Sequence, residues 1–307
     1  MLEFMSSNYY HCPWEEDSPE RVWCMVQAYL RSLKEIPPDG IAAALLQDHI
    51  EWSVICSIFF SNQIEGAGLG LSNTASLVRK ILQGQPLDPC LLYSSSGSSG
   101  KSTCEVVQHA AAFIFLKQHV VVEKKPLTPD IVLAAHKILM DGMVCEDGKP
   151  VNAGSYRDSL AHAGFHRFLH PELVQPSLVR LLANYNARAA SETEDPFALA
   201  AWLSYEFVTI HPFEDGNGRM CRLLLNMVLL SHGVPFCSAL GFSSGHRRAK
   251  QQYMNCIHKA QQHGGLPKRL AFVVLCSIRS SLAAFFETVR ISASEEYPKD
   301  LAMLLVA

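Results

Sequence analysis

The 307-residue chain lacks an excess of either charge, a long apolar run and any Cys-x-x-Cys pair. Its net charge of −3 provides no positive field that would attract nucleic acid. We find no apolar run near the roughly 18 residues that span a membrane, and no basic start with an apolar stretch typical of a secretion signal. These absences favour a globular protein that binds neither nucleic acid nor a membrane.

The ten cysteines are scattered without a regular framework. In a chain of this length, such a distribution is typical of reduced and mostly buried thiols rather than of a disulfide scaffold. We therefore expect a cytoplasmic protein. The length allows one large domain or two small ones, and we find no internal repeat of the period that builds solenoids.

Apolar residues recur at helical spacing along most of the chain, whereas the alternation that marks strands is nearly absent. The sequence therefore predicts an all-α fold. Two helix starts are marked, by Thr128 before Pro129 and by Asp195 before Pro196. A Ser/Gly-rich loop is expected over residues 94–102. The expected helices cover residues 21–33, 41–66, 105–121, 128–140, 173–190, 195–210, 219–232, 247–262 and 268–290.

Residues 211–222, His-Pro-Phe-Glu-Asp-Gly-Asn-Gly-Arg-Met-Cys-Arg, place a titratable base, two acids, a Gly-Asn-Gly turn and two arginines between two expected helices. Glycines at 216 and 218 allow successive backbone N–H groups to point inward at a helix start, which is a favourable site for an anion. The forked donors of Arg219 and Arg222 suit phosphate oxygens. The segment therefore predicts a phosphate-binding site.

Three other side chains of the segment have predicted roles as a base, a metal ligand and a structural anchor. His211 has an ordinary pKa near neutrality and can take a proton from an attacking hydroxyl. Asp215 is a hard oxygen ligand that suits magnesium together with phosphates. Phe213 is the expected buried anchor of the loop. A plain corner between two helices is the alternative, but a corner does not need this histidine, acid and pair of arginines.

At these residues the chain resembles the Fic (Fido) family, whose signature is His-x-Phe-x-Asp/Glu-Gly-Asn-Gly-Arg-x-x-Arg, and every specified position is filled. The resemblance implies an all-helical Fic core with a short β-hairpin flap. It also implies transfer of AMP from ATP, with magnesium, to a hydroxyl of a target protein. In that scheme His211 is the general base and Asp215 holds the metal. The implied nucleotide-binding stretch comprises Asp215, Gly216, Asn217, Gly218, Arg219, Met220, Cys221 and Arg222.

Flanking matches extend the resemblance over residues 127–276. Residues 154–157, Gly-Ser-Tyr-Arg, resemble the Gly-x-Tyr/Phe-Arg that opens the flap, where the target segment is expected to dock. Tyr253 falls where relatives place an aromatic residue near adenine. Gln252 and Ala260 stand where many relatives carry Tyr and Asn, which leaves the identity of the nucleotide open. The flap strand that would cover the nucleotide is Ala161, His162, Ala163 and Gly164.

Residues 61–66, Ser-Asn-Gln-Ile-Glu-Gly, are similar to the family's inhibitory motif, Ser/Thr-x-x-x-Glu-Gly/Asn. Glu65 lies in the last turn of its expected helix, where a negative charge opposes the helix dipole and gains from a nearby cation. The resemblance names Arg222 as that cation, so that Glu65 would act as a brake on productive ATP binding. The alternative is a solvated glutamate near a helix end.

We divide the chain into a flexible N-terminus (1–20), an N-terminal helical region with the inhibitory motif (21–126), the Fic core (127–276) and a C-terminal helix and tail (277–307). The favoured function is an autoinhibited protein adenylyltransferase. The same site could instead remove AMP or transfer another phosphate-containing group. An alternative of another class is a non-catalytic interaction module. The target protein and the oligomeric state, a homodimer included, stay open.

Overall fold

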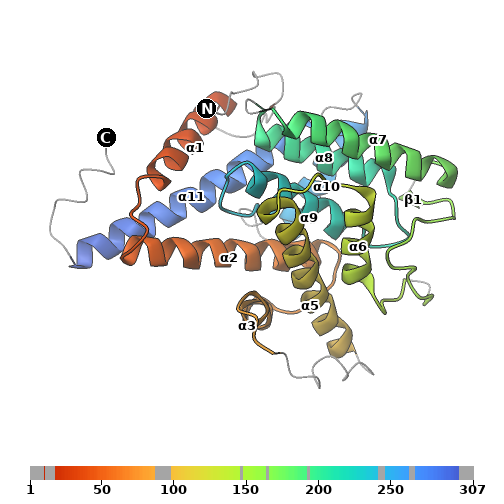
Figure 1. Ribbon diagram of the computed structural model, residues 1–307, viewed down its shortest axis with the longest axis horizontal. Helices are drawn as coiled ribbons and strands as arrows, with labels where there is room; N and C mark the ends of the chain where they lie inside the picture. Colours follow the sequence, from red (N-terminus) through yellow and green to blue (C-terminus); the bar gives the residue numbers. More distant parts are fainter. Residues whose placement is uncertain are drawn as a thin grey trace.

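The structure is a computed structural model that describes Tyr10 and residues 18–86, 98–145, 148–163, 166–191, 194–240, 246–262 and 267–296. Helices dominate these residues (Figure 1). The expected all-α class is confirmed. The elements are α1 (Pro19–Leu33), α2 (Ile41–Ile64), α3 (Leu71–Leu82), α5 (Ser98–Leu116), the π-helical η2 (Lys117–Val122), α6 (Pro129–Met140), β1 (His162–Ala163), β2 (His166–Arg167), α7 (Pro171–Ala189), α8 (Pro196–Ile210), α9 (Asn217–Ser231), α10 (His246–Gln262) and α11 (Lys268–Glu296).

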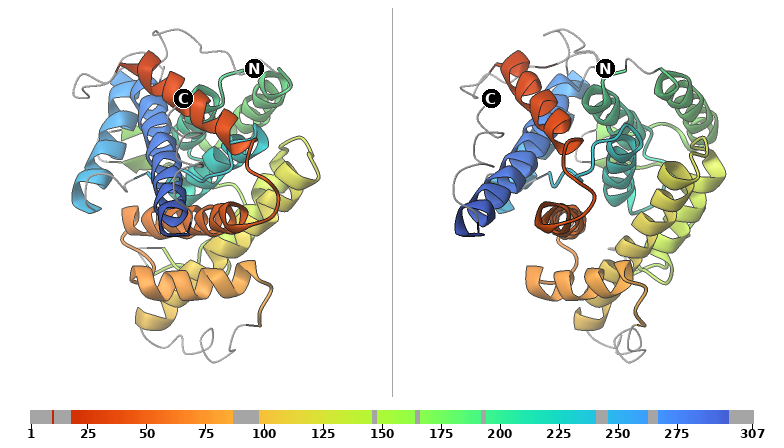
Figure 2. Two further views of the ribbon diagram at one scale, coloured as in Figure 1. Left: turned by 90° about the vertical axis from the view of Figure 1, so that its left-hand side faces the viewer. Right: turned by 60° about the vertical axis from the view of Figure 1, so that its left-hand side comes forward.

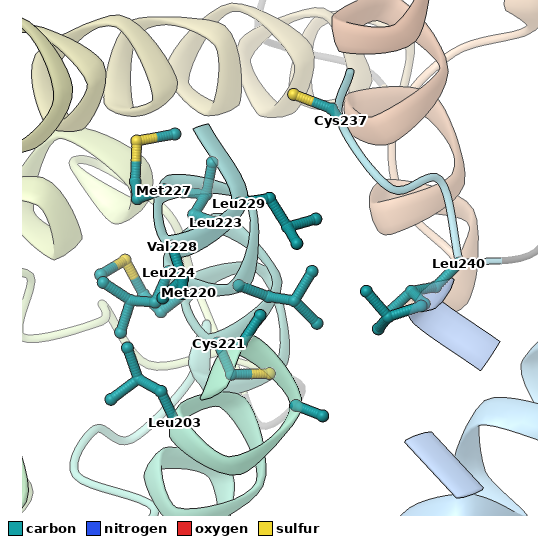
Figure 3. Packing of buried hydrophobic residues seen from close by; sticks show 14 of the residues in the cluster. Leu203, Met220, Cys221, Leu223, Leu224, Met227, Val228, Leu229, Cys237 and Leu240 are labelled. Carbon is teal, nitrogen blue, oxygen red and sulfur yellow. The ribbon is translucent and has the colours of Figure 1, made fainter. Parts of the chain in front are cut away.

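Helix α9 lies at the centre of the molecule. It packs against α8, α2, α5 and η2, and nearly all of its side chains are buried (Figures 1 and 3). The helix that carries both arginines of the motif is therefore held on several sides by apolar contacts, which dominate the stability of folded proteins. The labelled core side chains that it contributes to Figure 3 are Met220, Cys221, Leu223, Leu224, Met227, Val228 and Leu229.

Both marked helix starts are confirmed. The hydroxyl of Thr128 accepts a hydrogen bond from the backbone N–H of Ile131 at 3.4 Å. The carboxylate of Asp195 accepts from Phe197 and Ala198 at 2.9 and 3.2 Å. These caps satisfy N–H groups that have no partner inside the helix. The second cap fixes where α8 begins, and α8 ends one residue before His211.

One expectation about an individual segment was wrong, and two elements had not been predicted. The Ser/Gly-rich loop at 94–102 is helical in its second half, because α5 begins at Ser98, and residues 94–97 lie outside the described residues. Helix α3 was not expected, although Ala75 and Val78 recur at helical spacing on its buried face. The π-helical turn η2 continues α5 and has no distinct sequence signal.

The expected absence of a membrane-length helix also needs correction. Residues Lys268–Ser292 of α11 are long and apolar enough to cross a membrane by length and composition. In the structure, α11 packs against α1, α8 and α2 (Figures 1 and 2). Its side chains Leu275, Ile278 and Leu282 are fully buried. Of the apolar window, 44% is buried within the protein, so packing in the core accounts for part of its apolar composition.

Strands β1 and β2 form a two-residue antiparallel ladder that pairs His162 with Arg167 and Ala163 with His166. The N–H of Phe168 extends the pairing by donating to Ala161 O at 3.1 Å. Gly164, predicted as part of the flap strand, lies outside the described residues. The ladder lies where the sequence placed the flap, between α6 and α7.

The first twenty residues were expected to be loosely ordered, but the described part of this segment is docked. The side chain of Tyr10 is buried, and its hydroxyl donates to Asp195 Oδ2 at 2.5 Å. Ser18 caps α1, which begins at Pro19. The rest of the N-terminal segment, and residues 297–307 of the predicted C-terminal tail, lie outside the described residues.

Asp195 predicts a specific dependence of stability on pH. Burial raises its pKa to about 6 in the folded protein, above the value of roughly 3.9 for an unfolded chain. The folded state therefore binds the proton more tightly, so this stabilisation is complete below about pH 4 and is lost as the pH rises through about 6. As the pH falls from about 6 to about 4, we expect the free energy of unfolding of the wild type to rise by up to roughly 2–3 kcal/mol relative to that of Asp195→Asn.

Urea unfolding of both proteins from pH 4 to 7 measures this difference. Asparagine is also a good helix cap, so the variant removes the titration while keeping the residue type suited to the N-cap. Histidines that titrate in the same range cancel in the comparison. A free-energy difference that stays constant with pH would contradict the prediction.

Candidate functional site

His211 follows the last residue of α8 and has a left-handed backbone, with φ 52° and ψ 62°. Left-handed backbone is costly for a residue with a Cβ, and such residues gather at functional sites. The imidazole Nδ1 lies 3.3 Å from Val208 O. Because a carbonyl can only accept, Nδ1 carries the proton and Nε2 keeps its lone pair. Burial lowers the pKa of His211 to about 4, so the ring is neutral at pH 7.

The loop after His211 is fixed by Asn217. Its side-chain oxygen accepts from the N–H of Phe213 at 3.0 Å, and its side-chain nitrogen donates to Phe213 O at 2.8 Å. Both side chains are buried. The amide of Asn217 thus acts within the loop, so a contact with phosphate would have to come from its backbone.

His136 of α6 is a site residue that the sequence analysis missed. Its ring stacks on Phe213, with centroids 3.6 Å apart and planes 5° apart. Its Nε2 lies 3.0 Å from Asp215 O, and its Nδ1 accepts from the N–H of Gly154 at 2.9 Å. These partners require the neutral tautomer with the proton on Nε2. Burial lowers the pKa of His136 to about 4, which agrees with that state. His136 thereby joins the backbone at Gly154 to the loop of Asp215.

The glycine turn that was predicted to bind an anion lies at the start of α9. Gly216 has a φ of 79°, and α9 begins at Asn217. A Cβ atom at Gly218 would lie 2.2 Å from Glu65 Oε1 and 3.2 Å from Arg222 Nη1. The absence of a side chain at Gly218 is therefore what allows a carboxylate to approach the turn. The group that does so in this structure is Glu65.

Arg222 holds the residues of the predicted inhibitory motif. Its Nη2 donates to Glu65 Oε1 at 2.5 Å and to Ser61 O at 2.9 Å, while its Nε donates to Ser61 Oγ at 2.9 Å. The arginine side chain is 5% exposed and that of Glu65 is 34% exposed. Burial lowers the pKa of Arg222, but the Glu65 carboxylate outweighs it, so the net shift is upward. The predicted pairing of Glu65 with Arg222 is present.

Arg219 and Asp215 lie beside the same turn. Arg219 Nη2 is 3.7 Å from Asp215 Oδ1, which also accepts from the N–H of Gly216 at 2.5 Å. The guanidinium is nearly buried, and its Nε has no hydrogen-bond partner in the described part of the chain. A buried donor without a partner is unusual and is suited to an anion that arrives with a ligand. The Asp215 side chain is 44% exposed.

Helix α5 supports the turn that carries Glu65. Glu105 accepts from the N–H of Gly68 at 2.7 Å. His109 Nδ1 lies 2.9 Å from Asn62 Oδ1. Both side chains of α5 are buried. The end of α2 is therefore held between α5 and Arg222 of α9.

The remaining predicted nucleotide contacts are on the core side of α9. The side chains of Met220 and Cys221 are fully buried, so only their backbone can face a ligand. Tyr253 is also buried, with its hydroxyl 3.4 Å from Cys221 Sγ. The Arg222 guanidinium carbon lies 5.5 Å from the centre of the Tyr253 ring. A cation over an aromatic face is favourable, so Tyr253 supports the arginine directly.

The segment that contains β1 and β2 is tied to the motif by Arg157. This buried side chain donates to the carbonyls of His211, Ser159 and Leu169 at 2.6, 2.7 and 2.5 Å. Its backbone N–H also donates to Pro212 O at 3.0 Å. Of the predicted flap residues, His162 is exposed and Ala161 is partly buried. One guanidinium therefore links the backbone before β1 and after β2 to the carbonyl of His211.

The chain is similar to known Fic proteins. The family model described as Fic/DOC family matches residues 126–229. A Fido domain-containing protein of Dictyostelium discoideum is 46% identical over 133 residues, which are 42% of this chain and 89% of that protein. The match to protein adenylyltransferase fic-1 of Caenorhabditis elegans is 31% identical over 179 residues, 58% of this chain and 32% of that protein.

Solved structures show the same fold. A Fic domain-containing signaling protein from Bacteroides thetaiotaomicron has a TM-score of 0.66 at 23% identity, covering 88% of this chain and 97% of that one. Residues 134–508 of Fic-1 from C. elegans give 0.62 at 23% identity, covering 90% and 76%.

The chain belongs to the Fic/DOC family, and its all-α core is the Fic fold. Among its relatives are protein adenylyltransferases, including those of C. elegans and Nematostella vectensis. The chain spans about a third of the first and about half of the second, 32% and 52% of their lengths.

Proposed function

We propose that this protein transfers AMP from ATP to a hydroxyl of a target protein, and that Glu65 restrains the reaction. The observation that carries the proposal is the convergence, at the start of α9, of a neutral histidine, two buried arginines and a glycine turn that a carboxylate already approaches. The relatives named as protein adenylyltransferases support the same activity.

In the proposed reaction, His211 Nε2 accepts the proton of the target hydroxyl as its oxygen attacks the α-phosphate of ATP. A bond forms between that oxygen and the α-phosphorus, and pyrophosphate leaves. The backbone of the Gly216–Gly218 turn and the guanidinium of Arg219 stabilise the phosphate charges. Such chemistry depends mainly on positioning and charge neutralisation, which a rigid α9 supplies.

Asp215 would hold the magnesium ion that accompanies ATP. Among the described residues, no group of three or more histidine, cysteine or acidic side chains could hold a metal. One exposed carboxylate beside a phosphate site nevertheless fits magnesium, which commonly uses one or two carboxylates plus phosphate oxygens and water. When bound, the ion would neutralise phosphate charge.

The proposed flap is the segment that includes β1 and β2. Exposed edge strands accept extended peptides through backbone hydrogen bonds, so the target segment would pair with this ladder. Arg157 ties the flap to His211, so a hydroxyl presented there would lie near the base. Leu160, 72% exposed just before β1, offers an apolar contact for the target.

Two forms of labelled ATP test the proposed reaction. The Glu65→Gly protein is incubated with magnesium and a cell lysate, and ATP carries its label on either the α- or the γ-phosphate. AMP transfer predicts that target proteins gain the α-label and not the γ-label. Gain of the γ-label would indicate transfer of a phosphate instead. No label from either nucleotide, together with no ATP-induced thermal shift, would favour a non-catalytic interaction module.

A further inference from the structure

We propose that Phe168 is a positioning residue that holds the His211 imidazole in the orientation required for proton abstraction. The role rests on the proposed AMP transfer. The two rings are stacked, with centroids 3.8 Å apart and planes 16° apart. Phe168 comes directly after β2, so a residue of the flap packs against the proposed base.

The stacking orients the imidazole without blocking it. The lone pair of Nε2 lies in the plane of the ring, whereas Phe168 covers a face. On the same ring, Nδ1 is held by the carbonyl of Val208 at 3.3 Å. That hydrogen bond is long, so it leaves the imidazole free to rock unless a second contact restrains it. A phenyl ring against the face is such a contact, and it leaves Nε2 accessible at the edge.

Phe168 is itself held in register with His211. Its N–H donates to Ala161 O at 3.1 Å across the flap. The next carbonyl along the chain, that of Leu169, accepts from Arg157, and the same guanidinium donates to His211 O. The buried Arg157 side chain therefore binds the backbone of His211 and the backbone next to Phe168, and so holds the two stacked residues together. A displacement of the flap would move Phe168 away from the base.

This arrangement joins target docking to base orientation. The ladder of β1 and β2 is the proposed docking edge, and the residue that follows it packs on His211. Misplacing a catalytic group by about 1 Å can reduce a rate by roughly 100-fold. Phe168 is therefore expected to affect the chemical step rather than the binding of ATP.

Three proteins in the Glu65→Gly background test the role: the parent, Phe168→Leu and Phe168→Tyr. Leucine keeps an apolar side chain but removes the flat face, whereas tyrosine keeps the face. We expect leucine to lower kcat for self-modification by about 10- to 100-fold, with little change in the KM for ATP, and tyrosine to restore most of it. Melting temperatures confirm that each protein folds, and Phe168→Met replaces leucine if that variant does not.

A second readout does not depend on activity. In the parent, the ring current of Phe168 should displace the imidazole C–H resonances of His211, assigned by their loss in His211→Asn. The leucine variant should lose this displacement and the tyrosine variant should keep it. A Phe168→Leu protein with full kcat, or with His211 resonances unchanged from the parent, would overturn the role of Phe168 and leave the proposed AMP transfer standing. An inactive parent whose His211 resonances still show the stacking would instead overturn the proposed AMP transfer, and with it this role.

Discussion

Replacing Glu65 by glycine should raise the rate of AMP transfer by roughly 5- to 150-fold, the factor that corresponds to typical coupling free energies between two sites. The carboxylate of Glu65 lies against Gly218 and accepts a hydrogen bond from Arg222. It therefore occupies the proposed phosphate site at the start of α9 with a charge of the same sign as phosphate. Its removal frees the turn and one donor of the arginine for ATP. Initial rates of self-modification with α-labelled ATP measure the change.

Two further variants separate the causes. Glu65→Gln keeps the size of the side chain and removes its charge, so a rate between those of wild type and Glu65→Gly is expected if charge and bulk both contribute. Gln63→Gly introduces the same helix-weakening residue two positions earlier, and should leave the rate near that of the wild type. An equal increase in Gln63→Gly would attribute activation to loosening of α2 rather than to the carboxylate.

Replacing His211 by asparagine in the Glu65→Gly background should lower the rate by about 10²- to 10⁴-fold, the usual contribution of general acid–base catalysis. Asparagine is chosen because it tolerates the left-handed backbone of this position better than alanine, which limits unrelated damage to the loop. The amide of asparagine cannot act as a base at neutral pH. Initial rates with α-labelled ATP measure the loss.

The loss should appear in the chemical step. Affinity for magnesium-ATP, measured by calorimetry, should stay close to that of the parent because His211 is not expected to hold the phosphates. The control is His49→Asn. The ring of His49 is hydrogen-bonded to Leu45 O in α2, several turns before the predicted inhibitory motif at the end of the same helix. A His211→Asn protein that keeps its rate would remove His211 from the reaction.

Much of the site could be predicted because it is contiguous in sequence. The glycines and arginines between two expected helices predicted a phosphate site, and the structure places this loop between α8 and α9. Residues 61–66 could be joined to it only through the family resemblance, since periodicity alone does not indicate which cation meets Glu65. The structure supplies that contact through Arg222, which pairs with Ser61 and Glu65 together.

The supporting residues could not be predicted, because their roles depend on tertiary contacts. His136 lies in an ordinary amphipathic helix, and its bonds to Gly154 and Asp215 connect segments that are distant in sequence. Asn217 stands inside the motif, but the use of its side chain by Phe213 could not be read from spacing. The apolar length of α11 was underestimated because polar residues interrupt its apolar residues in sequence. On the folded helix, these apolar residues form one buried face.

The central claim is that the Glu65 carboxylate and the phosphates of ATP compete for one place, above Gly218 and beside Arg222. A crystal structure of Glu65→Gly with magnesium-ATP tests it most directly. The account predicts a phosphate group in the space that the carboxylate occupies, within hydrogen-bond distance of the Arg222 guanidinium. Phosphates bound elsewhere, with the space above Gly218 left empty and Arg222 bonded to Ser61 alone, would contradict it.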